Sequence, residues 1–541
     1  MANEATPKSD KPKRKPRKAP KAKPAAPALK SAQPLFETSD WSFDLLRSAY
    51  DAIEEIAIGE LGLDVYPNQI EVITSEQMLD AYASIGMPLL YKHWSFGKRF
   101  ARDETLYRKG AQSLAYELVI NSDPCICYVM EENSITMQTL VMAHAAFGHN
   151  HFFKNNYLFK QWTRADAVLD YLDFAKRYVA KCEERHGLEA VERTLDCAHA
   201  LMSNGVNRYA APRRLSDARK RERALERLSY EEATYDDLWR TLPTSDAPAE
   251  ADDEHARDTR LEAEDLGLPE ENLLYFLEKN APKLADWQRE LLRIVRYLAQ
   301  YFYPQRQTKV MNEGCATFVH YEIMNRLFEK GLIGEGAMLE FLHSHSSVVF
   351  QPGFDDRRFG GLNPYALGFA MMRDLQRICD EPTEEDGEWF RDIAGGGDAY
   401  GVLREAWADY RDESFIHQFL SPTVMRDFRL FRIADDAEDP EMEVSAIHDE
   451  RGYRELRKTL ARQYDVGSQD PRLEVVEANL SGNRRLVVNH AVRDGRLLDK
   501  TEAENTLQYL ADLWGHRVKM LETDVEDGDV LVEHDALPRP R

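Results

Sequence analysis

Residues 135–159 read ITMQTLVMAHAAFGHNHFFKNNYLF, a stretch with apolar side chains at most positions and no clear polar face. It contains no proline, and its only glycine is Gly148. Such a run is longer than a typical strand, and a helix that is apolar all round is typically enclosed by other elements. We therefore predict a long, largely buried helix here, at the centre of a mainly α-helical domain.

The same stretch contains three histidines, a residue type that often binds metals. His144 and His149 are five residues apart and would lie about 140° apart on a regular helix, which turns about 100° per residue. The zinc-protease motif HExxH needs two histidines four apart with a glutamate between them, and both features are missing. One extra residue in the turn, a π-bulge, would bring His144 and His149 onto one face. The spacing alone leaves a metal site and an ordinary helix both open.

A second apolar stretch, MNEGCATFVHYEIMN at residues 311–325, contains the ionisable residues Glu313 and His320. A buried Glu313 needs a partner, which can be an ion, a cationic side chain or a hydrogen-bond network. His144, His149 and Glu313 could therefore form a three-ligand site for zinc or iron, with His320 as a fourth ligand or as a support behind the ligands. The alternative is a buried polar network that fixes the packing of the helices.

The sequence offers no clear general base for such a metal site. Glu131, Glu132 and His151 are the catalytic candidates because they lie near the histidines in the sequence. Candidate binding residues are the polar residues Asn150, Lys154, Asn155 and Asn312 of these stretches, together with Asn363 and Tyr365 at the end of a later polar loop. Neither GxxxxGK[ST] nor a GxGxxG turn between strand and helix occurs, so no nucleotide cofactor is predicted.

The pattern changes along the chain. Residues 1–34 are rich in Lys, Pro and Ala and are expected to be a disordered basic tail. Helical patterns dominate residues 35–424, interrupted by an acidic linker or insertion at about 241–267. Residues 425–535 then alternate apolar and polar residues around one amphipathic helix, which predicts a small C-terminal α+β domain.

The charge is distributed unevenly. The chain of 541 residues has a net charge of −24, but residues 1–30 have ten lysines and arginines against Glu4 and Asp10, a local charge of +8. The remainder carries −32, which makes nucleic acid an unlikely main ligand because phosphates would be repelled.

The location of the protein is predicted from what the sequence lacks. No stretch has the roughly 18 to 20 continuous apolar residues of a membrane span, and the N-terminus lacks the apolar segment of a secretory signal. The six cysteines are too few and too scattered for a disulfide framework. These features predict a cytoplasmic protein with reduced thiols.

Four blocks, in this order, resemble the SpoVR family, named after the stage V sporulation protein R of spore-forming bacteria. They are AYELVINSDPCICYVMEEN (115–133), MAHAAFGHNHFFKNNYLF (142–159), MNEGCATFVHYEIMN (311–325) and GGLNPYALGFAMMRDL (360–375). The resemblance covers about residues 35–520. The family's NEGWATF is NEGCATF here, so Cys315 replaces a tryptophan, which would widen any pocket that this tryptophan lines.

The resemblance implies a role in formation of the spore cortex, in the cell envelope or in a stationary-phase stress pathway. It also implies a PrkA-type serine protein kinase and a protein with a von Willebrand A-like domain as partners. The block NEGxA is similar to the EGxA helix of some metallopeptidase-like families, in which the glutamate binds zinc. Two hypotheses follow: a metal-dependent, zincin-like hydrolase without HExxH, or a non-enzymatic regulatory or scaffold protein.

Overall fold

The computed structural model describes residues 33–540 except Ile85, Pro88, 109–116, 209–265, 435–442 and Asp494. The predicted basic tail and nearly all of the acidic linker therefore lie outside the described residues. Within the described part, no helix is both long enough and apolar enough to cross a membrane.

The opening stretch forms the buried helix that was predicted. It consists of α4 (Ile135–Met142), the π-helical segment η2 (Ala143–His149) and α5 (Asn150–Asn155), and every residue from 135 to 153 is buried. Ser134 caps its start by accepting a hydrogen bond from the backbone N–H of Met137. The helix ends at Asn156, whose side chain donates to the backbone carbonyls of Trp407 and Tyr410.

Close backbone approaches at small residues join this segment to one helix and that helix to another. At Gly148, an added Cβ would lie 2.5 Å from the Cα of Ala316 in α13 (Lys309–Glu329). On α13 itself, Gly314 faces Gly368 of α15 (Pro364–Asp380), and a Cβ at Gly314 would lie 2.7 Å from the Gly368 backbone. Only glycine permits such backbone approach, so these contacts fix how α13 lies between η2 and α15.

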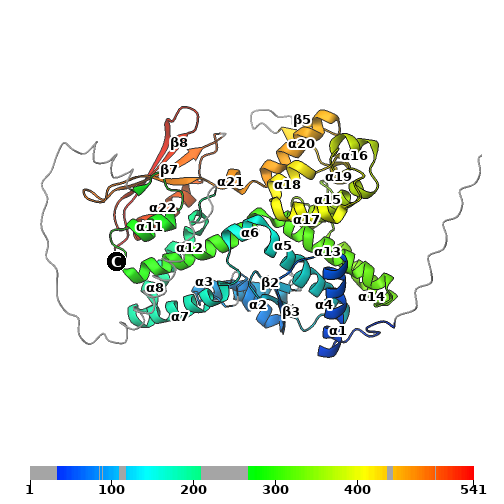
Figure 1. Cartoon of the computed structure of the whole chain (residues 1–541). Helices are drawn as coiled ribbons and strands as arrows, with labels where there is room; N and C mark the ends of the chain where they lie inside the picture. Colours follow the sequence, from blue (N-terminus) through cyan, green and yellow to red (C-terminus); the bar gives the residue numbers. More distant parts are fainter. Residues whose placement is uncertain are drawn as a thin grey trace, which may run out of the picture.

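A three-stranded sheet packs beside η2 (Figure 1). Its order is β1-β3-β2, in which β3 (Cys125–Met130) pairs in parallel with β1 (Asn68–Ile73) and antiparallel with β2 (Glu117–Ile120). Every residue of β3 is buried. This sheet brings β2 to the histidine-containing turn.

Other helices complete the mainly α-helical region: α1 (Phe43–Glu54), η1 (Glu55–Glu60), α2 (Ser75–Ala83), α3 (Trp94–Arg108), α6 (Tyr157–Trp162), α7 (Val168–His186), α8 (Leu188–Ala200), η3 (Met202–Asn204), α11 (Leu273–Asn280), α12 (Asp286–Gln307), α14 (Glu335–Val348), α16 (Glu384–Trp389), α17 (Ala399–Asp409), α18 (Asp412–Phe419), α19 (Pro422–Asp427), α20 (Glu450–Gln463) and α21 (Val466–Gln469). A short pair of strands, β4 (Arg432–Ala434) and β5 (Glu443–Ala446), precedes α20.

The chain ends in a small α+β unit, at the upper left in Figure 1. Its sheet has the order β6-β7-β8-β9, with strands β6 (Leu473–Ala478), β7 (Leu486–Val492), β8 (Val518–Asp524) and β9 (Val530–Ala536). The helix α22 (Lys500–Trp514) connects the parallel strands β7 and β8. The predicted fold class is thus confirmed, although β1 and β9 were not predicted.

The predicted domain boundary at residue 425 stays a prediction. The helix α20 follows this boundary but packs against α18, which precedes it. The C-terminal sheet instead shares a hydrophobic core with α8, α11 and α12. The side chains of Leu473, Val488 and Trp514 belong to this shared core.

A buried ion pair holds α15 to α16, and we expect it to matter for acid stability. Asp386 is 2% exposed, and both of its carboxylate oxygens accept hydrogen bonds from Arg377, at 2.6 and 2.9 Å. Burial opposes ionisation, but hydrogen bonds from Arg377 and Thr383 outweigh it and lower the pKa of Asp386 to about 2. A lowered pKa stabilises the fold above the unfolded value of about 3.9, and this stabilisation is lost as the pH falls toward 2.

We therefore expect Asp386→Asn to lower the free energy of unfolding by about 2 kcal/mol at pH 7. The loss should shrink between pH 4 and pH 3, because the wild type then begins to lose the same interaction. Urea unfolding of the wild type and the variant at pH 7, 5, 4 and 3 measures this difference in the free energy of unfolding. A difference that stays constant over this range would contradict the ionic origin of the effect.

Candidate functional site

The π-helical turn η2 brings two predicted metal ligands together. A π-helix closes hydrogen bonds over five residues, so His144 and His149 lie on one face instead of about 140° apart. Their ring centroids are 4.6 Å apart, and the two residues are 4% and 7% exposed, respectively. The π-bulge that the sequence left open is therefore present.

Glu117 of β2 completes a group of three potential ligands. One ligand atom from each of Glu117, His144 and His149 lies within 4.8 Å of the others. The distance between His144 Nε2 and Glu117 Oε1 is 3.7 Å. Ligands of a tetrahedral zinc ion with bonds of about 2.0–2.1 Å are roughly 3.3 Å apart, so a small inward movement would suffice.

The other ring nitrogen of each histidine is already engaged. His149 Nδ1 lies 2.9 Å from Oδ1 of Asn312, and donation to that oxygen leaves the Nε2 lone pair available. His144 Nδ1 lies 2.9 Å from His320 Nδ1, and His320 Nε2 lies 2.9 Å from His345 Nδ1. When each ring in this chain donates to the next, His144 also presents its Nε2 lone pair toward Glu117. His320 thus contacts the ring nitrogen of His144 that does not face Glu117, and so orients the His144 ring.

Glu313 lies beside this group, on the other side of His149. Its Oε2 is 3.6 Å from His149 Nε2, and it is a buried oxygen that has no hydrogen-bond partner among the described residues. The phenol of Tyr365 is close enough to Glu313 for that carboxylate to raise its pKa, and the Tyr365 ring lies 6.5 Å from that of His144. A buried carboxylate oxygen without a partner is uncommon and suits a ligand or a reacting group.

The burial of these groups shifts their protonation. Burial, followed by the negative charge of Glu313, raises the pKa of Glu117 to about 8. Burial also lowers the pKa of His144 and His320, and neighbouring imidazoles lower both further. The pKa of Tyr365 is raised by burial first and then by Glu313 and Glu117, so its phenol stays a hydrogen-bond donor. Two half-buried carboxyl groups close to the histidines favour a bound cation.

The three catalytic candidates from the sequence make their contacts elsewhere. His151 Nδ1 lies 3.0 Å from both the N–H and the carbonyl of Asp64, and its ring contacts Trp407. Glu131 is exposed, and its carbonyl accepts from Trp41. Glu132 accepts from the backbone of Ser75 at the start of α2.

Several candidate binding residues have structural contacts. Asn150 bridges the backbone of Tyr66 and the side chain of Asn68. Lys154 pairs with Asp64 at 2.6 Å. Asn155 donates to the carbonyl of the same residue, Asp64.

Of the remaining candidates, one has a structural contact and two lie beside the histidine group. Asn363 caps α15 by accepting from Tyr365 N–H. Asn312 and Tyr365 contact the histidine group or Glu313, as described above. Cys315 is fully buried, with its Sγ 3.8 Å from the carbonyl of Gly148, so it packs between α13 and η2.

Sequence reasoning missed Glu117. The sequence shows it as a single carboxylate within the apolar stretch YELVI, residues 116–120. This stretch was interpreted only as an amphipathic segment or strand. Nothing local connects this residue to the histidines, which follow more than 25 residues later.

Comparison with known proteins adds the following. Residues 40–469 match the family described as SpoVR like protein, and residues 471–525 match the SpoVR-like C-terminal domain. The chain is 52% identical over 505 residues to the uncharacterized protein YcgB of Escherichia coli (strain K12), across 93% of this chain and 97% of that protein. No solved structure matches the chain.

Proposed function

This chain belongs to the SpoVR family, and from that premise we propose that it is a metal-dependent hydrolase. Glu117, His144 and His149 hold one divalent ion, zinc or iron. The bond that is cleaved is an amide or peptide-like bond. The observation that carries the proposal is the group of three ligand atoms within 4.8 Å, which come from two buried histidines and a half-buried glutamate on two separate elements.

A divalent ion held there supplies a Lewis acid. The ligand set of two histidines and one carboxylate is one that catalytic zinc sites use, and it leaves a further position open. Glu117 takes the ligand role that the sequence suggested for Glu313.

Glu313 then supplies the general base that the sequence did not reveal. Its free Oε2 is 3.6 Å from His149 Nε2, so it faces the edge of the ligand group and can accept a proton there. Tyr365, whose pKa is raised partly by Glu313, keeps a protonated phenol beside this carboxylate. His320 and Asn312 hold the rings of His144 and His149.

The pathway and partners rest on the family resemblance alone. We propose a cytoplasmic role in spore cortex formation, the cell envelope or stationary-phase stress, with a PrkA-type kinase and a von Willebrand A-like protein as partners.

The test separates metal binding from catalysis in one variant. Untagged wild-type protein should contain near one equivalent of zinc or iron by mass spectrometry, and Glu313→Gln should retain it. The same variant should lose at least about 100-fold in the hydrolysis of a peptide library, because a general base contributes roughly that much. Glu388→Gln, an exposed glutamate on α16, is the control and should change neither quantity.

Two results would contradict this reading. Equal hydrolysis by Glu313→Gln and wild type would remove Glu313 as the base. A wild type without metal, even after incubation with zinc or iron, would leave the histidine group as the polar core of a regulatory or scaffold protein.

A further inference from the structure

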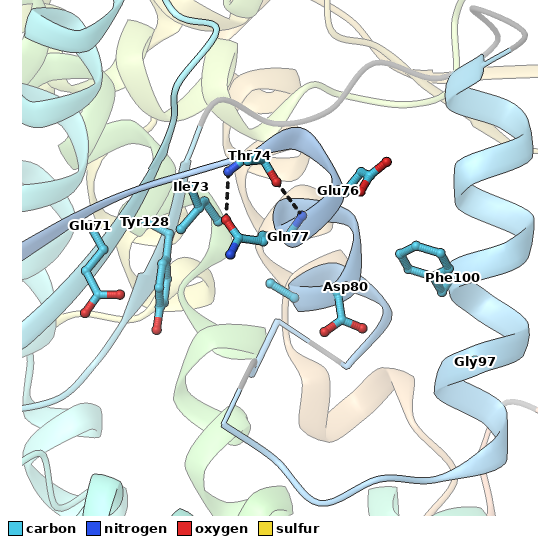
Figure 2. A pocket seen from close by; sticks show the side chains of 10 residues that line it. Glu71, Ile73, Thr74, Glu76, Gln77, Asp80, Gly97, Phe100 and Tyr128 are labelled. Atoms are coloured by element: carbon cyan, nitrogen blue, oxygen red, sulfur yellow. Dashed lines mark hydrogen bonds between the residues drawn. The ribbon is translucent and has the colours of Figure 1, made fainter.

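A second site lies at a pocket of about 820 Å³, formed by the sheet, α2 and α3 (Figure 2). Tyr128 and Glu71 stand next to each other on the paired strands β3 and β1. Glu76 and Asp80 come from α2, and Phe100 from α3. None of these residues belongs to the histidine group.

The pocket has negative charges without cationic partners. Glu71 accepts a hydrogen bond from the amide of Gln69 at 2.6 Å. In the part of the chain that the structure describes, no lysine or arginine forms an ion pair with Glu71, Glu76 or Asp80, although ion pairs are frequent elsewhere. Three carboxylates around one pocket favour a cationic occupant.

Tyr128 provides an independent indication of a ligand. The residue is 8% exposed and lines the pocket, and its hydroxyl, which keeps access to solvent, has no hydrogen-bond partner among the described residues. A phenol held on a pocket wall with its hydroxyl free can hydrogen-bond to an occupant. Together with Phe100 and Ile73, the Tyr128 ring gives the pocket apolar and aromatic walls, which suit the alkyl stem of a lysine or the plane of an arginine.

We propose that this pocket binds the basic N-terminal segment of the same chain, residues 1–32. This segment carries ten lysines and arginines against two acids, a charge of +8 that complements the pocket. An extended segment of this length reaches about 100 Å, and tethering gives it an effective concentration on the order of mM.

Near its start, the described chain lies beside Leu332 at Leu35 and then passes near the pocket at Trp41. The indole of Trp41 donates to the carbonyl of Glu131 at 2.9 Å, and the backbone N–H of Glu131 donates to the carbonyl of Ile73. Ile73 is itself part of the pocket wall. The chain that follows the basic segment therefore passes the rim, and this inference does not depend on the metal proposal.

The test is a distance measurement in the full chain. All six native cysteines are buried, so cysteines introduced by Ala19→Cys and Lys98→Cys can be spin-labelled selectively. Lys98 is exposed and adjoins Gly97 of the pocket wall. Double electron–electron resonance should show a population of short distances between the two labels at low salt. About 0.5 M salt should remove this population, because it screens the charges.

The pocket variant combines Glu71→Gln, Glu76→Gln and Asp80→Asn. It should lose the short-distance population, and Tyr128→Phe should reduce it. The control combines Glu384→Gln, Glu388→Gln and Asp392→Asn, which changes the same charge at exposed positions and should keep it. Circular dichroism verifies that both variants fold.

Two outcomes would overturn the proposal. One is a distance distribution that is the same in the wild type, the pocket variant and the control. The other is loss of the short distances when labelled protein is diluted with unlabelled wild type, because the segment would then bind a second copy of the chain.

Discussion

Replacing Glu117 with glutamine is expected to weaken the binding of zinc or iron at least about 100-fold while the chain stays folded. An amide keeps the shape of the carboxyl group but cannot supply its negative charge to a cation. Because burial raises the pKa of Glu117 to about 8, the folded protein gains nothing from ionising this group when no metal is bound. The metal-free variant should therefore be no less stable than the metal-free wild type.

Competition with a coloured chelator measures the affinity, and mass spectrometry measures the metal content. His144→Ala and His149→Ala should lose the metal to the same extent. Glu131→Gln is the matched control because this exposed glutamate lies near the same histidines in the sequence but is not part of the ligand group. Retention of a full equivalent of metal by Glu117→Gln would contradict the proposed ligand set.

Replacing Gly368 with alanine is expected to lower the free energy of unfolding by about 3 kcal/mol or more. The added Cβ would overlap the carbonyl of Val310 and lie 2.8 Å from the Cα of Gly314. Both obstacles are backbone atoms of α13, so α15 would have to move away from it. Tyr365 of α15 and Glu313 of α13 would separate as a result, and the hydrolytic activity should fall together with stability.

Urea unfolding monitored by tryptophan fluorescence tests this expectation. Gly336→Ala in α14 is the control, because a Cβ at that position has no atom within 4 Å. Alanine favours helix more than glycine does, so the control should be neutral or slightly stabilising. Equal stability of Gly368→Ala and the wild type would show that the α13–α15 contact is not as close as described.

The buried helix and the C-terminal domain could be predicted because their signals are local. The largely apolar stretch at 135–159 and the alternating strands β6, β7 and β8 each identify an element from its own residues. The strand β9 was missed because its residues are mostly exposed and give little alternation. The strand β1 was missed because five of its six residues are half-buried, so no polar face alternates with an apolar one.

The candidate site was predictable only in part. The sequence identified His144, His149, Glu313 and His320 because polar residues are uncommon in buried helices. It could not decide whether the helix continues regularly through His144 and His149 or adds one residue to a turn. This choice depends on packing against α13, where Gly148 contacts Ala316.

The sequence by itself determined most of the helices, the strands β6 to β8, the family blocks and the residue types that can bind a metal. Periodicity and composition act over a few residues, and a single chain displays them directly. The tertiary structure alone decided that Glu117 joins the histidines and that Glu131 and His151 lie elsewhere. It also decided that Glu313 stands beside the histidines with an oxygen that has no hydrogen-bond partner among the described residues. These arrangements depend on strand pairing and helix crossing between segments that are distant in the sequence. Such contacts produce no periodic pattern of apolar and polar residues.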